Sequence, residues 1–465
     1  MTLAAVDRHT GLRPPAPDPR GEALGIIGLL RALWNNPLET WTREHFEKPI
    51  VAGGLATARA VVISEPAAIR RVLLENPSNY RKDALTLRIL SAGLTNGLLT
   101  AEGEQWRTQR RTLAPMFTRR TVSSFAPAMA DAADALVARW QRHPDGAILD
   151  VAAEVTRVTL EVLERTIFSD GLGTDTEQFR AIMAGYFDTI GKIDPFDVLG
   201  LPDVVPRLTR WRARGTLRFF DAAVDTIIST RRRNLALDPV GVPHDILTLL
   251  LEAQDPETGQ GMSEAEVRGN IITFIAAGHE TTSNTLAWSI FLLSQSAEWR
   301  ARVVAESRRE IGGPVDGLAE RLVETRAVIE EAIRLYPPIV AISRAAIGPD
   351  DLAGHRIRPG TMVVIAPYVL HRHHRLWHRP DVFDPGRFLG EARDRIDRYA
   401  YLPFGAGPRI CIGSAFSLQE ATLVLAKIMS NFDLEVAPGH PVWPLQRVTL
   451  RPRGGLPMVV RRRPS

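Results

Sequence analysis

A single cysteine, Cys411, limits the cross-links and metal sites that these 465 residues can form. One thiol cannot close an intrachain disulfide. It also cannot supply the four protein ligands of a structural zinc or iron–sulfur site. Three roles remain for Cys411: a buried small hydrophobe, a nucleophile, or one axial ligand to a cofactor that carries its own other ligands.

The sequence around the cysteine favours the ligand. Phe404 to Gly413 reads Phe-Gly-Ala-Gly-Pro-Arg-Ile-Cys-Ile-Gly. Gly405 and Gly407 permit a tight turn whose backbone N–H groups can point at a sulfur atom.

A helix is expected directly after the cysteine, because apolar residues between positions 415 and 429 recur with helical spacing. The dipole at the start of this helix favours a thiolate over a thiol at Cys411. Arg409 adds a nearby cation that is suited to a carboxylate partner. The segment therefore predicts an electron-rich ligand beside a cation.

A capping box, Ser263 followed by Glu266, predicts the start of a long helix. No proline interrupts the sequence before Ser296, so the helix can be about 50 Å long at ~1.5 Å per residue. Its middle, residues 277–282, reads Ala-Gly-His-Glu-Thr-Thr. Glycine costs about 1 kcal/mol relative to alanine inside a helix, and threonine is also a poor helix former. Such a conflict in an otherwise consistent helix indicates a functional site.

Three residues of this segment have distinct expected uses. Gly278 would let a flat ligand approach the helix backbone. Thr281 can donate to a carbonyl oxygen one turn back and open a groove for water or dioxygen. His279 stands alone beside Glu280 and is assigned no metal.

The pattern Phe-x-x-Gly-x-Arg-x-Cys-x-Gly resembles the haem-binding loop of the cytochrome P450 family of haem-thiolate enzymes. The segment at 277–282 resembles the distal helix of that family, in which an acid–alcohol pair delivers protons to dioxygen. The resemblance implies that Cys411 is the iron ligand and that Glu280 and Thr281 are catalytic. It covers about residues 60–460 and implies haem b as the cofactor.

The resemblance also implies where the haem is held. Trp106 and Arg110 lie four residues apart, on one face of an expected helix. In the family, such a pair meets a haem propionate, as does an arginine in a strand, here Arg344. The implied haem contacts are Trp106, Arg110, Ala277, Gly278, Arg344, Phe404, Gly405, Arg409, Cys411 and Gly413.

A further implied feature is a structural ion pair. Glu331 and Arg334 lie on one face of an apolar helix, and a buried carboxylate and guanidinium must be paired. The family locks this pair with a later arginine, here Arg387. The match is incomplete, because Gly386 stands where the family often has glutamate.

The fold implied is mainly α with small β-sheets: the P450 fold, with its long distal helix and cysteine loop. We expect residues 1–40 to be an extended, proline-rich lead-in and residues 41–465 to be one domain. Helices are expected at 66–74, 122–167 (in two pieces), 176–190 and 209–233, strands at 60–63, 339–346 and 361–366, and a loop at 235–244. Residues 83–99 lack periodicity, and Gly454-Gly455 predicts a hairpin between 448–450 and 457–460.

Composition sets the remaining expectations. A net charge of +4 gives no reason to expect a nucleic-acid partner. The apolar run from Leu24 to Leu30 is far shorter than the ~20 residues that span a bilayer. A lone cysteine is compatible with a reducing compartment. We therefore expect a soluble bacterial-type member of the family, cytoplasmic and monomeric, without a membrane anchor.

The resemblance implies a monooxygenase that inserts one atom of dioxygen into an apolar organic substrate. Two alternatives remain open: a peroxide-using haem-thiolate enzyme, which would be expected to lack the acid–alcohol pair, and a haem-binding protein that is not an enzyme. With no second cysteine to hold a cluster, electrons are expected from a separate ferredoxin or flavodoxin with its reductase. The expected docking patch consists of Arg107, Arg111, Arg119 and Arg120.

Overall fold

The computed structural model describes residues 11–55, 58–91, 94, 96–169 and 208–464. Helices make up most of these residues, and the sheets are small, as predicted. The longer helices are α5 (Gly103–Leu113), α7 (Ala126–Gln141), α8 (Val151–Ile167), α11 (Leu208–Leu237), α13 (Glu264–Gln295), α14 (Ala297–Glu310), α16 (Val323–Leu335) and α19 (Ser414–Asn431). The shorter ones are α1 (Ile26–Asn35), α2 (Arg43–Glu47), α3 (Pro66–Arg70), α4 (Ala84–Ser91), α6 (Arg119–Ser124), α12 (Ile246–Glu252), α15 (Leu318–Arg321), α17 (Pro367–Leu370) and α18 (Gly390–Asp394).

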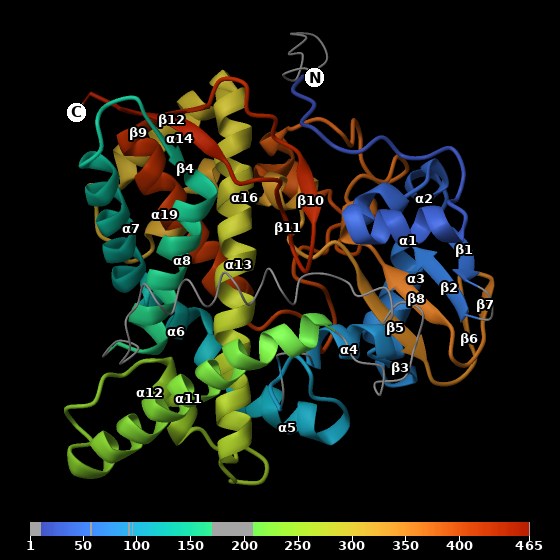
Figure 1. Cartoon of the computed structure of the whole chain (residues 1–465), viewed down its shortest axis with the longest axis horizontal. Helices are drawn as coiled ribbons and strands as arrows, with labels where there is room; N and C mark the ends of the chain where they lie inside the picture. Colours follow the sequence, from blue (N-terminus) through green and yellow to red (C-terminus); the bar gives the residue numbers. More distant parts are fainter. Residues whose placement is uncertain (1–10, 56–57, 92–93, 95, 170–207, 465) are drawn as a thin grey trace.

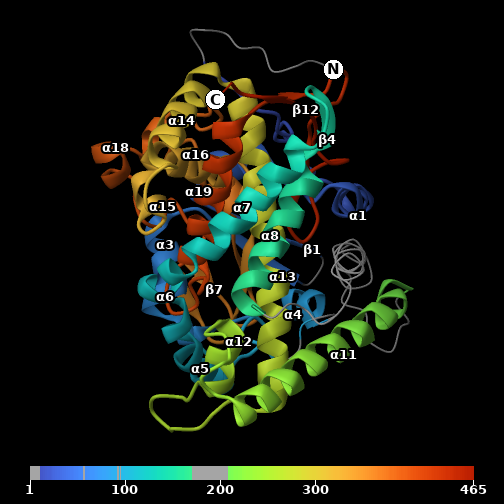
Figure 2. The ribbon, with the colours of Figure 1, turned by 90° about the vertical axis from the view of Figure 1, so that its left-hand side faces the viewer.

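Helix α13 runs through the length of the molecule (Figure 1). Its start is the predicted capping box: the Glu266 amide donates to the Ser263 hydroxyl, and the Ser263 amide donates to the Glu266 carboxylate. The helix packs against α8, α16 and α19, and α7 and α8 lie in front of it in Figure 2. Because neighbours surround α13, its second half is buried on all sides, with Trp288 stacked on Tyr336 at a ring separation of 3.8 Å.

The strands within the described residues form four small sheets, and the largest lies to the right of α13 in Figure 1. The strands are β1 (Ile50–Leu55), β2 (Ala58–Ile63), β3 (Tyr80–Arg81), β4 (Ala147–Asp150), β5 (Ile342–Ala346), β6 (Asp350–Leu352), β7 (His355–Ile357), β8 (Met362–Ile365), β9 (Phe432–Val436), β10 (Pro444–Gln446), β11 (Leu450–Pro452) and β12 (Pro457–Arg462). The largest sheet has the order β1-β2-β8-β5-β3, in which only β2 and β8 pair in parallel. This sheet carries Arg344 on β5.

The expected extended lead-in is wrong for part of residues 1–40. Residues 26–35 form α1, and part of the preceding segment is held to the rest of the protein by hydrogen bonds. The Pro15 carbonyl accepts a hydrogen bond from the buried Tyr336 hydroxyl at 2.8 Å, and the Leu12 carbonyl accepts from the Phe383 amide at 2.9 Å. Proline lacks an N–H but keeps its carbonyl oxygen, so a proline-rich segment can still satisfy a buried donor.

Two other local predictions are wrong. The segment after Asp83 contains α4, because the Asp83 carboxylate accepts from the Leu85 and Thr86 amides and caps the helix. The hairpin around Gly454 does not form. Strand β11 pairs with β10, whereas β12 pairs with β4 and β9, so the glycines carry the chain from one sheet to another. The helix predicted at 176–190 lies outside the described residues.

Candidate active site

The cysteine loop is a tight turn that leads into α19. The Cys411 amide donates to the Phe404 carbonyl at 2.9 Å. Gly405 and Gly407 adopt φ of +73° and +72°, a region that favours glycine. A Cβ at Gly407 would lie 1.8 Å from the Leu73 carbonyl oxygen. Only glycine therefore allows this loop to pack against the segment at Leu73.

Cys411 lies just before the N-cap of α19, as predicted, but its thiol is not acidified. Its side chain has exposed surface, yet protein atoms surround it closely enough that burial raises the pKa of the thiol. The Gly413 amide, which donates to the sulfur, and the positive charge of Arg110 lower this pKa by less. The turn amide and the nearby cation thus act in the expected direction, but burial outweighs them. A metal ion deprotonates a coordinating thiol by its own charge, so the arrangement still fits ligation.

The middle of α13 contains an exposed alanine, Ala277, and a threonine, Thr281, whose hydroxyl donates to the preceding turn of the helix. Ala277 is exposed although the helix around it is mostly buried. The Thr281 hydroxyl donates to the Ala277 carbonyl at 2.7 Å, as predicted from its position one turn on. Thr282 and Ser417 share a hydrogen bond of 3.0 Å, which joins α13 to α19. The distal segment and the helix that follows Cys411 are thus held together directly.

Gly278 has a role in packing that the sequence did not indicate. A Cβ at this position would lie 3.1 Å from the Leu163 side chain of α8. The glycine therefore allows α13 and α8 to pack closely. Glu280 accepts a hydrogen bond from the Thr449 hydroxyl at 2.8 Å, and that hydroxyl in turn accepts from the Asn284 amide at 3.0 Å.

Cations gather beside the cysteine loop. The Arg409 guanidinium stacks over the Trp106 ring at 4.3 Å. Arg110 is half-buried, and none of the described carboxylates pairs with it. Burial lowers the pKa of Arg344, and the charge of Arg409 lowers it further. The structure thus brings together Trp106, Arg344 and Arg409, and it places Arg110 near Cys411.

Two residues that the sequence did not single out join this group. The Lys82 ammonium lies 3.0 Å from a Glu102 carboxylate oxygen, and Lys82 is 8% exposed. Among the described residues, Asp83 and Glu102 are the carboxylates that act on Lys82, Arg344 and Arg409, and none pairs with Arg110, so these four cations exceed the carboxylates by two charges. Two carboxylates, the number that a haem carries, would balance them. The donor set and its charge therefore fit haem, with Cys411 as the iron ligand.

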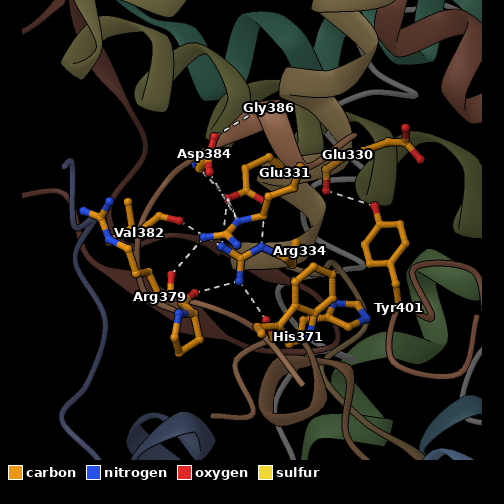
Figure 3. Close-up of polar contacts among 12 residues, drawn as sticks. Glu330, Glu331, Arg334, His371, Arg379, Val382, Asp384, Gly386 and Tyr401 are labelled. Atoms are coloured by element: carbon orange, nitrogen blue, oxygen red, sulfur yellow. Dashed lines mark hydrogen bonds and ion pairs between the residues drawn. The ribbon is translucent and has the colours of Figure 1, made fainter. Parts of the chain in front are cut away.

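Glu331 and Arg334 form an ion pair, and both side chains are completely buried (Figure 3). Two Arg334 nitrogens donate to Glu331 oxygens at 2.6 and 2.8 Å. Arg334 also donates to the His371, Pro380 and Val382 carbonyls. The expected lock by Arg387 is weak: its Nε lies 3.6 Å from Glu331 without a hydrogen bond, and its Nη2 donates instead to the Arg379 carbonyl. The Asp384 amide supplies the further hydrogen bond to Glu331.

His279 is buried, and its Nδ1 lies 2.9 Å from the Ile275 carbonyl oxygen. Burial lowers the pKa of His279 to about 4, so the neutral ring donates this bond. The pKa of His279 is lower in the folded protein than in the unfolded chain. The contribution of the neutral His279 ring to stability is therefore complete above pH 6.5 and is lost as the pH falls through 4. About 3 kcal/mol of unfolding free energy should be lost over this window.

Urea titrations at several pH values test this prediction. His279→Asn should be less stable than the unchanged protein at pH 7, and the difference should shrink towards pH 4. A constant difference across the window would show that His279 does not titrate with unfolding.

The fold and the site together define a class: a mainly helical protein in which the helix after the single cysteine packs against a long helix. A model of the cytochrome P450 family matches residues 14–456. The cyclooctat-9-en-7-ol 5-monooxygenase of Streptomyces melanosporofaciens is 34% identical over 437 residues, 92% of each chain. The pentalenene oxygenase of Streptomyces avermitilis is 30% identical over 452 residues, 96% of each chain. The chain belongs to the cytochrome P450 family and is a monooxygenase of that family, which uses haem.

Solved structures agree with this assignment. The crystal structure of the cytochrome P450DA heme domain is similar, with a TM-score of 0.83 at 27% identity, over 97% of this chain and 99% of that one. None of the helices in the described ranges combines the length and apolar character that a membrane crossing requires.

Proposed function

We propose that this P450 uses haem b to insert one atom of dioxygen into an apolar organic substrate. The observation that carries the proposal is the joining of the two motifs: the Thr282–Ser417 hydrogen bond fixes the distal segment of α13 to the helix that follows Cys411. When bound, the haem supplies the activation of dioxygen and the transfer of an oxygen atom, while the second oxygen leaves as water. We propose a monomer in the cytoplasm.

The chain's own residues bind, orient and supply protons. Cys411 is the proposed axial ligand, and Arg110, Arg344 and Arg409 are the proposed partners of the haem carboxylates. The Thr281 hydroxyl donates to the Ala277 carbonyl, so its oxygen can accept a hydrogen bond from a water molecule and would position that water to supply a proton. We propose Glu280 as the proton source, with its carboxylate positioned by the buried Thr449 hydroxyl.

The proposed substrate is an unsaturated hydrocarbon or its alcohol. The names of the two Streptomyces relatives describe oxidation of compounds of this kind. Apolar side chains of α4, among them Leu87 and Leu90, keep exposed surface. A titration of candidate compounds against the spin state of the haem tests this class, because a substrate that displaces water from the iron changes the spin state.

The variant Thr281→Ala should distinguish between a monooxygenase and a peroxide-using enzyme. The variant should bind substrate nearly normally but release peroxide, because the positioned hydroxyl is lost. Product per electron consumed should fall on the order of tenfold. Thr285→Ala is the matched control, because Thr285 also donates to a carbonyl one turn back on α13. Unchanged product per electron in Thr281→Ala would remove Thr281 from the mechanism.

The proposed electron donor is a separate acidic ferredoxin or flavodoxin, but the docking patch differs from the one expected. Arg111 is held by the buried Asp255 in two hydrogen bonds of 2.9 and 3.0 Å, and Arg107 pairs with Glu104 at 2.8 Å. Arg119 and Arg120 on α6 are exposed, and among the described residues neither has a carboxylate partner. Helix α6 packs against α19, the helix that follows Cys411.

Reversing Arg119 and Arg120 to glutamate should therefore slow reduction by such a carrier several-fold and flatten its salt dependence. Peroxide-driven turnover, which bypasses the carrier, should keep its rate. Arg461→Glu on β12, a strand that lies well apart from α6 in Figures 1 and 2, is the control. Equal reduction rates in all variants at low and high salt would place docking elsewhere.

A further inference from the structure

Lys82 and Glu102 form a charged group with Arg409, and the three come from separate parts of the chain. Lys82 follows β3, Glu102 immediately precedes α5, and Arg409 lies in the cysteine loop. One Glu102 oxygen lies 3.0 Å from the Lys82 ammonium and 3.2 Å from the Arg409 guanidinium. Both cations also donate to the Ala101 carbonyl, at 2.8 and 3.3 Å. Glu102 therefore bridges a buried lysine to the arginine that precedes Cys411.

The orientation of the Glu102 side chain is set by these cations and not by the helix. Glu102 occupies the N-cap position of α5, where a carboxylate commonly accepts from the first backbone amides. Its side chain makes no such hydrogen bond. It is directed instead to Lys82 and Arg409, and the first turn of α5 forgoes side-chain capping at this position.

The charges of the group are not balanced within the chain. Burial, and after it the charge of Arg409, lower the pKa of Lys82 to about 8 against the opposite effect of Glu102. Arg344 is subject to the same two effects: burial, then Arg409. Glu102 bridges Lys82 and Arg409, and Asp83 and Glu102 both act on Arg344, so three cations share two carboxylates among the described residues. An anionic ligand would complete the group. The two carboxylates of a haem have the required chemistry.

We propose that Lys82 and Glu102 are positioning residues that set the charge around the haem carboxylates: Lys82 as an additional cation, and Glu102 as an internal carboxylate that shares Arg409 with the haem. This inference rests on the proposed function. Reduction adds one electron to the haem, so a nearby cation favours the ferrous state and a nearby carboxylate favours the ferric state. The two residues should therefore shift the ferric–ferrous equilibrium in opposite directions.

Reductive titration of the haem-loaded protein with redox mediators, which supply the electron, tests this inference. Lys82→Met should favour the ferric state on the order of tenfold, and Glu102→Gln should favour the ferrous state by a similar factor. The ferric–ferrous equilibrium of the double variant should be close to that of the unchanged protein. Lys82→Arg keeps the positive charge, so its equilibrium should also match that of the unchanged protein. Lys82→Met should also release haem to excess apomyoglobin several-fold faster, because one partner of the haem carboxylates is lost.

The exposed pair Lys48 and Glu44 provides matched controls. The same replacements, Lys48→Met and Glu44→Gln, remove the same charges from side chains that are 57% and 52% exposed, and they should leave the equilibrium unchanged. Shifts of the same sign in Lys82→Met and Glu102→Gln, or shifts no larger than in these controls, would overturn the inference. Failure of the proposed function is separate: the unchanged protein would then lack the thiolate-type spectrum of its carbon-monoxide complex.

Discussion

Cys411→Ser should lose the red-shifted carbon-monoxide band of a thiolate-ligated haem and most of its bound haem. A serine hydroxyl stays protonated near neutral pH and is a poor iron ligand, whereas a thiolate is a strong one. The loop itself should survive the change, because its turn depends on Gly405 and Gly407 and on the backbone bond from residue 411 to the Phe404 carbonyl. Monooxygenase turnover should fall below detection. The measurement is the difference spectrum of the reduced protein with and without carbon monoxide.

Cys411→His is the companion variant. Histidine can bind haem iron through a nitrogen atom, so this protein should retain haem but show a spectrum without the red-shifted band. A protein that kept the thiolate-type band after either replacement would show that Cys411 is not the ligand. If circular dichroism showed that Cys411→Ser had lost its fold, its spectrum would report on folding and not on ligation. The Cys411→His variant would then decide whether Cys411 is the ligand.

Arg334→Leu should be the most destabilising single replacement in the helical body. It would leave the completely buried Glu331 carboxylate without its partner and the His371, Pro380 and Val382 carbonyls without a donor. Removal of one member of a buried ion pair costs about 3–5 kcal/mol. We expect a large fall in the urea midpoint of unfolding, or no folded protein at 37 °C.

Arg395→Leu is the control for this prediction, because Arg395 and Glu391 form an ion pair with side chains that are 77% and 89% exposed. Exposed pairs contribute little to stability, so the unfolding midpoint should hardly change. Equal midpoints for the two variants would mean that the buried pair is not required for stability. Arg387→Leu should lower the unfolding midpoint less than Arg334→Leu does, since Arg387 lies 3.6 Å from Glu331 without a hydrogen bond.

Features encoded by neighbouring residues were predictable from the sequence. The capping box at Ser263, the helix after Cys411 and the turn at Gly405 each depend on residues within a few positions of one another. The pairing of Glu331 with Arg334 was predictable for the same reason, because a helix places residues three apart on one face. The family resemblance also rests on contiguous motifs, chiefly the cysteine loop and residues 277–282, and the match to the family model confirms the family. The roles of the individual site residues stay predictions.

Contacts between distant segments were not predictable. Nothing near Arg111 in the sequence indicates that Asp255 neutralises it, and this contact removes Arg111 from the docking patch. The use of Gly278 depends on Leu163 of α8, and the pairing of β12 depends on β4 and β9. In each case tertiary packing determines which residue or strand is the partner, and the local secondary-structure propensity of a segment does not specify that packing.

The sequence by itself determined the ligand loop, the long helix and the family, because contiguous residues set turns, caps and helical faces. Only the tertiary structure decided how charge is arranged around Cys411. Lys82, Glu102 and Arg409 lie in three segments that meet when α5 packs beside the cysteine loop. The energies of the interactions among these three side chains depend on their burial and on separations of about 3 Å. Both are set only when the chain folds.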